Sequence, residues 1–282
     1  MNHPQNEALA AVAQSAGRAK VAAVQMVSTP RVAENLRVAG ELIAEAVGRG
    51  AQFVALPEYF PIMGMSDADK VAAREDDGAG PIQEFLAATA RRHGIWLAGG
   101  SIPLRASEPG KMLNTTLVFD PQGERVARYD KIHLFGFQKG SERYDESATI
   151  EPGRKPVTVS TPFARVGLSI CYDLRFPELY RSFGPCDLLL VPAAFTETTG
   201  RAHWEILLRA RAIENQCYVL AIAQGGLHEN GRETHGNSML VDPWGEILAR
   251  QAKGAGVVIG EIDLARIAEV RASLPALRHR VL

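Results

Sequence analysis

Three side chains that could carry out acyl-transfer chemistry each follow a short apolar segment. Glu58 comes after the segment QFVALP, Lys131 after RVARYD and Cys171 after RVGLSI. Such apolar runs are typical of buried strands, and open α/β sheets bind their ligands at the carboxyl ends of strands. We therefore predict that three strands of one sheet bring a carboxylate, an ammonium group and a thiol to one pocket.

These three groups suit nucleophilic attack on an acyl carbon. A thiol with an ordinary pKa of about 8.5 is mostly protonated at neutral pH, although the thiolate is the reactive form. Glu58 could accept the thiol proton, and Lys131 could favour the thiolate and stabilise an oxyanion. The backbone N–H of Tyr172 would be a second oxyanion donor. Taken singly, each residue also has an ordinary reading: Cys171 as a buried small hydrophobe, and Glu58 and Lys131 as solvated charges.

The sequence around these residues resembles the nitrilase, or carbon–nitrogen hydrolase, superfamily. The matching motifs are LPE at residues 56–58, YDKIHLF at residues 129–135 and GLSICYDLRFPEL at residues 167–179. The three motifs stand in the family's order, and the resemblance extends from about residue 19 to the C-terminus. It implies an α/β fold of the αββα four-layer sandwich type with mixed sheets.

The resemblance also implies a role for each residue of a Glu-Lys-Cys triad. Glu58 takes the place of the general base, Lys131 of the oxyanion stabiliser and Cys171 of the nucleophile that forms a thioester. Many members carry a second active-site glutamate between the lysine and the cysteine, and Glu146 occupies that place here. Glu146 would orient Lys131 or the attacking water, and the alternative is a solvated loop charge.

The segment after the nucleophile is similar to the amidase branches of the family, since nitrile-hydrolysing members tend to carry Trp-Glu where this chain has Tyr172-Asp173. Residues 194–205 and 208–218 resemble the branch of deaminated glutathione amidase and ω-amidase, and residues 223–226 and 236–239 fit the first of these better. The resemblance implies hydrolysis of deaminated glutathione to 2-oxoglutarate and cysteinylglycine. The alternatives are 2-oxoglutaramate as the substrate and a carbamoyl amidase.

Candidate substrate-binding residues are Arg175, Phe195 and Thr199. Substrates of this branch contain a 2-oxo diacid, and arginine binds a carboxylate through two parallel hydrogen bonds. Arg175 lies four residues beyond the nucleophile; the alternative for it is a structural ion pair with Glu178 or Asp173. The resemblance places Phe195 and Thr199 in the pocket.

Composition argues against several other classes of protein. The formal net charge is −1, and scattered Lys and Arg residues favour neither a nucleic-acid binder nor a membrane-surface protein. No apolar run approaches the ~20 residues that span a bilayer, and the N-terminus lacks the pattern of a secretory signal, so we expect a cytoplasmic protein. The seven histidines show no metal-ligand spacing and no P-loop pattern occurs, so we expect neither a metal nor another cofactor.

Two alternatives of another class are a thiol redox sensor and a catalytically silent binding protein. A sensor would need a second cysteine near Cys171, but Cys186 and Cys217 are distant in sequence, and Cys217 lies in an apolar strand. The complete set of Glu58, Lys131 and Cys171 argues against a silent protein. The expected partners are a small-molecule amide and a second copy of the chain, because family members usually form homodimers or larger homo-oligomers.

Strands and helices that must position these residues alternate along the chain, which is typical of α/β proteins. We predict strands at residues 20–27, 52–56, 95–101, 115–120, 125–129, 165–170, 187–191, 217–223, 238–241, 247–250 and 257–262, and helices at residues 32–49, 82–93, 203–215 and 264–271. Residues 131–155 look irregular, and a long loop of this kind is often functional. The pattern indicates one domain at residues 19–282 after a flexible extension at residues 1–18.

Overall fold

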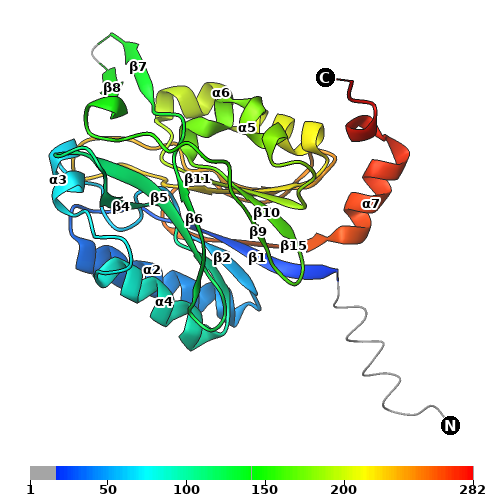
Figure 1. Cartoon of the computed structure of the whole chain (residues 1–282), viewed down its shortest axis with the longest axis horizontal. Coiled ribbons are helices and arrows are strands. Elements are labelled where there is room, and N and C mark those ends of the chain that lie inside the picture. The colour runs from blue at the N-terminus through cyan, green and yellow to red at the C-terminus, as the bar shows by residue number, and fades with distance from the viewer. Residues whose placement is uncertain (1–16, 141, 282) are drawn as a thin grey trace.

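Two sheets face each other at the centre of the protein in the computed structural model, which describes residues 17–140 and 142–281. Helices α2 (Val32–Gly48) and α4 (Pro81–His93) cover the outer face of one sheet. Helices α5 (Pro177–Ser182) and α6 (Glu197–Asn215) cover the outer face of the other (Figure 1). This arrangement confirms the predicted αββα sandwich.

The first sheet has the strand order β15-β1-β2-β3-β5-β4, with β6 paired to β5. Its strands are β1 (Arg18–Gln25), β2 (Phe53–Ala55), β3 (Trp96–Ala98), β4 (Ile102–Arg105), β5 (Met112–Phe119), β6 (Arg125–Asp130) and β15 (Gly256–Asp263). Strands β1, β2 and β3 are parallel, β5 is antiparallel to β3, and β6 is antiparallel to β5. Strands β2 and β6 therefore run in the same direction and end at the same edge.

The second sheet has the order β14-β13-β12-β11-β10-β9. Its strands are β9 (Thr158–Ser160), β10 (Arg165–Leu168), β11 (Leu188–Ala193), β12 (Tyr218–Ala223), β13 (Ser238–Val241) and β14 (Ile247–Gln251). Strands β10, β11 and β12 are parallel. A parallel bridge between Met26 and Gln224 joins the ends of β1 and β12, so the parallel strands of both sheets end at one edge of the sandwich.

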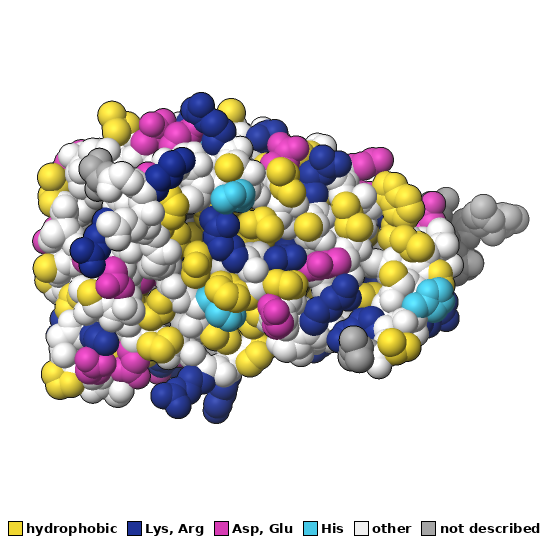
Figure 2. Space-filling model, turned by 90° about the horizontal axis from the view of Figure 1, so that it is seen from above, with side chains coloured by type: hydrophobic (Ala, Val, Ile, Leu, Met, Phe, Trp, Pro, Cys, Tyr) yellow, Lys and Arg dark blue, Asp and Glu magenta, His cyan; other side chains and the backbone are white. Residues whose placement is uncertain are grey.

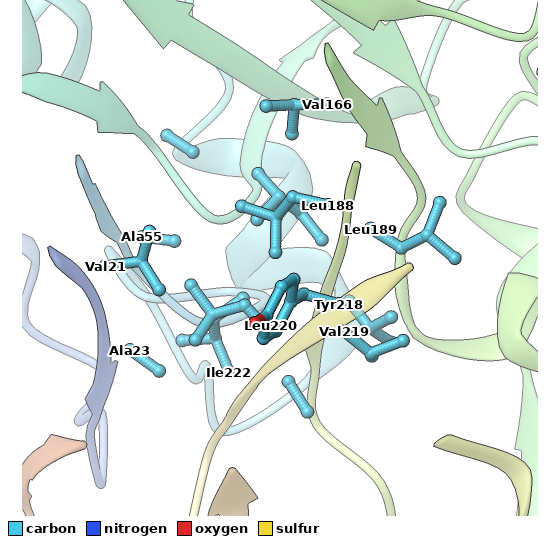
Figure 3. Packing of buried hydrophobic residues seen from close by; sticks show 14 of the residues in the cluster. Val21, Ala23, Ala55, Val166, Leu188, Leu189, Tyr218, Val219, Leu220 and Ile222 are labelled. Carbon is cyan, nitrogen blue, oxygen red and sulfur yellow. The ribbon is translucent and has the colours of Figure 1, made fainter. Parts of the chain in front are cut away.

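Successive side chains of a strand point to opposite faces of its sheet, so the strands of the first sheet contribute to two apolar cores. Val21 and Ala23 of β1 pack in the core between the sheets, whereas Ala22 and Val24 pack in the core beneath α2. Figure 3 shows the space between the sheets, where Leu220 and other second-sheet side chains lie near small residues of the first. Burying each Val or Leu contributes about 1.5–3 kcal/mol, so the two cores hold the edge that carries the site.

Several predicted boundaries were wrong for local reasons. Helix α6 begins at Glu197 rather than at residue 203, because the Thr196 side chain accepts a hydrogen bond from the Thr199 N–H and caps the helix. Residues 131–155 are not wholly irregular, since β7 (Gly136–Lys139) pairs with β8 (Glu142–Asp145) and a 3-10 turn follows at Glu146–Ala148. The predicted strand at residues 95–101 is divided between β3 and the turn before β4.

Four further elements complete the described chain. Helix α7 (Leu264–Ser273) agrees with the helix predicted at residues 264–271. Helix α3 (Asp67–Ala72) and the 3-10 helices at Cys171–Arg175 and Ala276–Arg278 were not predicted from the sequence. The predicted N-terminal extension lies outside the described residues except for positions 17 and 18, and Arg18 already belongs to β1.

Charged side chains of both signs are interspersed on the face that carries α5 and α6 (Figure 2). Among the helices that the structure describes, none combines the length and apolarity that a bilayer-spanning segment requires.

Candidate active site

The three predicted reactive residues meet at one edge of the sandwich, although they come from two sheets. Glu58 follows β2 and Lys131 follows β6, both in the first sheet, whereas Cys171 follows β10 in the second. The prediction of a single sheet was therefore wrong. The residues still converge, because the sheets face each other with their parallel strands ending at the same edge.

Glu58 is 1% exposed, and both of its carboxylate oxygens have fixed partners. Oε1 accepts hydrogen bonds from Lys131 Nζ at 2.9 Å and Asn114 Nδ2 at 3.0 Å, and Oε2 accepts one from the Ala194 N–H at 2.9 Å. Gly100 packs behind this turn with a φ of 54°, and a Cβ at that position would lie 2.1 Å from the Pro57 carbonyl oxygen. The close approach of these two backbones thus requires glycine.

Lys131 lies between two carboxylates, and its side chain is 0% exposed. Its Nζ donates to Glu58 Oε1 and to Glu146 Oε1, both at 2.9 Å. Glu146 also accepts hydrogen bonds from the Tyr59 hydroxyl and the Phe135 N–H. With a side chain only 15% exposed, Glu146 is not a solvated loop charge. Nζ also lies 2.7 Å from Glu146 Oε2, and rotation of the ammonium group can turn one of its three N–H groups toward a substrate oxygen.

Cys171 stands at the sharp turn where β10 passes into the 3-10 helix, with a φ of 50°. Asp173 stabilises this turn by accepting a hydrogen bond from the Ile170 N–H at 2.8 Å. Tyr172 is the second residue of the short helix, and amides in a first helical turn have no acceptor within the helix. Its N–H is therefore suited to bind an oxyanion beside the thiol.

Charge and burial act together on the reactive groups. Burial and the negative charge of Glu58 raise the pKa of the Cys171 thiol well above its usual range, despite the opposing effect of Lys131. Burial also favours protonation of Glu58, but Lys131 and the thiol hydrogen bond outweigh it and lower the Glu58 pKa. Burial disfavours the charged form of Lys131, yet Glu146 and Glu58 raise its pKa. The free site thus holds a neutral thiol beside a carboxylate and an ammonium ion.

The predicted substrate-binding residues Arg175, Phe195 and Thr199 line the same pocket as Cys171. The Arg175 guanidinium lies over the rings of Tyr172 and Phe195, at 5.6 and 5.3 Å from their centroids. Its Nη1 is 3.2 Å from Nδ1 of His203. Within the described chain, Arg175 forms no ion pair with Glu178 or Asp173, so the structural alternative for this residue was wrong.

Four residues of this region were not singled out from the sequence: Tyr59, Asn114, Asp173 as a positioning group, and Arg232. Tyr59 follows Glu58 directly and has a φ of 55°, but its neighbours are not diagnostic of any role. Asn114 could have been identified from the sequence, because it is a polar residue at the start of an otherwise apolar strand. Arg232 lies in a Gly- and Asn-rich loop and lines the pocket, and nothing in the sequence near it indicates that position.

Neither remaining cysteine approaches the site. Cys186 and Cys217 are both buried, and burial raises the pKa of Cys186 to about 11. Among residues 17–140 and 142–281, no three His, Cys, Asp or Glu side chains are grouped so as to hold a metal ion. The described lining of the pocket includes two carboxylates, two guanidinium groups and the thiol: Glu58, Glu146, Arg175, Arg232 and Cys171.

Comparison with known proteins gives consistent matches. Residues 20–272 match the family described as carbon-nitrogen hydrolase. The chain is 47% identical over 266 residues to a deaminated glutathione amidase of Synechocystis, covering 92% of this chain and 97% of that protein. It is 40% identical over 273 residues to omega-amidase NIT2 of Xenopus tropicalis, covering 93% and 94%. The C. elegans NitFhit structure matches with a TM-score of 0.84 and 40% identity over 94% of this chain, which spans only 65% of that longer chain.

Proposed function

Since this chain belongs to the carbon–nitrogen hydrolase family, we propose that it cleaves an amide bond of a small carboxylated substrate through a thioester on Cys171. The family and its amidase-named relatives make the chain a hydrolase of carbon–nitrogen bonds other than peptide bonds. The observation that carries the finer proposal is the contact of Lys131 with both Glu58 and Glu146 in the pocket that Cys171 lines.

The first half-reaction forms the thioester and releases the amine. Glu58 accepts the thiol proton as Sγ of Cys171 attacks the carbonyl carbon. An N–H of the Lys131 ammonium group and the Tyr172 amide stabilise the negative oxygen of the tetrahedral intermediate. Glu58 then donates its proton to the nitrogen, the C–N bond breaks, and the amine leaves.

The second half-reaction hydrolyses the thioester. Glu58, again a carboxylate, accepts a proton from a water molecule that attacks the thioester carbonyl. The C–S bond breaks, the proton returns to Cys171, and the carboxylic acid is released. Glu146 keeps Lys131 in place through both halves, because it binds Nζ directly and is itself held by Tyr59 and Phe135. No metal or organic cofactor enters these steps.

Deaminated glutathione is the proposed substrate, with 2-oxoglutarate and cysteinylglycine as the products. Arg175 provides a guanidinium in the pocket for the carboxylate of the 2-oxo diacid. The second candidate substrate is 2-oxoglutaramate, which is favoured by the similarity to an omega-amidase over most of the chain. Replacing Arg175 with glutamine should raise KM for both substrates by roughly 10- to 100-fold, because each loses a charged hydrogen bond.

The decisive experiment measures 2-oxoglutarate release from each substrate by the purified protein. Release that is absent in Cys171→Ala and present in Cys186→Ala would support the proposed nucleophile. The ratio of the two kcat/KM values would choose between the substrates. Absence of release from both in the wild-type protein would contradict the proposed substrate class.

We also propose a cytoplasmic homodimer or larger homo-oligomer. The three cysteines are free thiols, which suits a reducing compartment. Ile206 of α6 is 69% exposed, and Trp244 and Leu248 near the β13–β14 turn are 51% and 48% exposed. A second copy of the chain would bury such apolar side chains, and light scattering of Ile206→Asp against the wild-type protein would detect the loss of that association.

A further inference from the structure

A second, more open cavity adjoins the catalytic pocket, and we call it the outer groove. It is lined by residues 63–67, Lys70, Arg143, Tyr144 and residues 230–232, and its volume is about 370 Å³. Arg232 is the residue that lines both the outer groove and the pocket of Cys171. Its side chain therefore stands at the junction between the two spaces.

The catalytic pocket itself has room for little more than a water molecule. Its free volume is about 10 Å³, close to the minimum that one water requires. A leaving group as small as ammonia could depart within a slightly widened pocket. The pocket must already widen to admit the 2-oxo acyl group, and a dipeptide leaving group needs further space, which the adjoining outer groove offers.

Hydrogen bonds link Arg232 to Glu58 through the backbone of Ala194. Nη2 of Arg232 donates to the carbonyl oxygen of Ala194 at 2.7 Å. The backbone N–H of Ala194 in turn donates to Glu58 Oε2 at 2.9 Å. In the proposed reaction Glu58 protonates the leaving amine. An amine that Glu58 protonates is therefore released close to Arg232, which also lines the outer groove.

The charges of the outer groove are not balanced. Lys70 is neutralised by Asp67, which lies 2.7 Å from its Nζ, and Asp67 is the one carboxylate among the lining residues described. In the part of the chain that the structure describes, neither Arg143 nor Arg232 forms an ion pair. Nε of Arg232 is buried and has no hydrogen-bond partner, and its guanidinium lies over the Tyr144 ring at 4.9 Å. Two guanidinium groups thus retain donors for an anionic ligand.

We propose that the outer groove is the subsite for the leaving group, and that Arg232 and Arg143 select amides whose leaving amine carries a carboxylate, such as a dipeptide. This inference rests on the proposed amidase function. It makes Arg232 and Arg143 specificity-determining residues, distinct from Arg175, which is proposed to bind the acyl part. It also separates the two candidate substrates, because 2-oxoglutaramate releases only ammonia.

The test compares three amides of the same 2-oxo diacid. Their leaving groups are ammonia, cysteinylglycine and cysteinylglycinamide, in which a neutral amide replaces the carboxylate. The wild-type protein should prefer cysteinylglycine to cysteinylglycinamide by roughly 10- to 100-fold in kcat/KM, the range expected for a hydrogen-bonded charge. Arg143→Gln should reduce that preference roughly tenfold, and Arg232→Gln should reduce it more. Lys139→Gln, which removes an exposed charge from the same hairpin but not from the groove, is the matched control.

Two results would overturn the inference: equal turnover of the carboxylate and carboxamide substrates by the wild-type protein, or the same preference in Arg143→Gln as in Lys139→Gln. Arg143 is exposed, so this variant is not expected to fail through misfolding. A binding measurement separates this inference from the proposed function. Calorimetry of Cys171→Ala should show tighter binding of alanylglycine than of alanylglycinamide, and the difference should disappear with Arg143→Gln. Equal binding of the two dipeptides would refute the subsite even if the protein releases 2-oxoglutarate.

Discussion

Tyr129 donates a hydrogen bond of 2.6 Å to Asp173, and this contact joins the strand before Lys131 to the turn that carries Cys171. Asp173 is fully buried and also accepts hydrogen bonds from the Ile170 N–H and the His133 N–H. A single carboxylate therefore binds groups from both sheets. We infer that it sets the distance between the ammonium group and the thiol.

Tyr129→Phe should lower the free energy of unfolding by about 2 kcal/mol, because it removes a hydrogen bond to a buried charge. It should also reduce kcat more than it changes KM, since the reactive groups shift relative to each other. Tyr180→Phe is the matched control, as its hydroxyl donates to the neutral Ser169 hydroxyl and should cost about 1 kcal/mol. Urea unfolding would measure the change in stability and steady-state kinetics the change in kcat. Equal losses of stability and of kcat in Tyr129→Phe and Tyr180→Phe would contradict the role of Asp173.

Lys131→Met should abolish turnover and destabilise the protein by about 3–5 kcal/mol near neutral pH, because it leaves Glu58 buried without its cation. In the wild-type protein the lowered Glu58 pKa contributes stability that is present above the unfolded value of about 4.3 and is lost as the pH falls through the folded pKa. In the variant, burial without Lys131 raises the Glu58 pKa instead. The variant should therefore recover part of the lost stability between about pH 7 and about pH 5. Urea unfolding of both proteins at the two pH values would measure this. A stability difference between wild type and Lys131→Met that stays the same at both pH values would refute the prediction.

Glu58→Gln should separate thiol reactivity from catalysis. Burial and the Glu58 charge raise the Cys171 pKa, so alkylation of the wild-type thiol by iodoacetamide should be slow at neutral pH and should accelerate as the pH rises. The substitution removes the negative neighbour and leaves Lys131, which favours the thiolate. Alkylation at neutral pH should then be faster, by up to about tenfold for each unit by which the pKa falls, while amide hydrolysis is lost. Intact-mass spectrometry of proteins in which Cys186 and Cys217 are replaced would report the rate of alkylation. Slower alkylation of Glu58→Gln than of the protein with Glu58 would contradict the proposed effect of Glu58 on the thiol.

Gly100→Ala should destabilise the protein strongly and reduce activity, since its Cβ would lie 2.1 Å from the Pro57 carbonyl oxygen next to Glu58. Gly94→Ala is the matched control, because Gly94 also has a positive φ, of 62°, but an added Cβ there meets nothing within 4 Å. The control should show only the cost of a left-handed alanine, about 1 kcal/mol. Thermal unfolding would compare the two, and similar losses would show that the close approach at Gly100 is easily relieved.

Local signals in the sequence determined much of the outcome. Helix α4 begins at Pro81 and ends before Gly94, and Gly94 adopts the left-handed conformation. Proline favours the first turn of a helix and glycine favours its end, whatever surrounds them. The apolar segments before Glu58, Lys131 and Cys171 predicted strands, and reactive residues at strand ends predicted one shared pocket. These inferences depend on near neighbours in the chain and on an alternation that any buried strand shows.

Tertiary structure alone decided which sheet each strand joins. A strand buried on both faces has the same apolar composition in either sheet, so the sequence could not show that Cys171 comes from the sheet opposite Glu58. The same applies to Asn114 and the Ala194 N–H, which bind Glu58 across 56 and 136 residues. It applies also to Arg232, which lines the pocket only because the packing of the two sheets brings its loop beside Cys171. Contacts between distant residues depend on that packing, and short-range sequence patterns do not encode them.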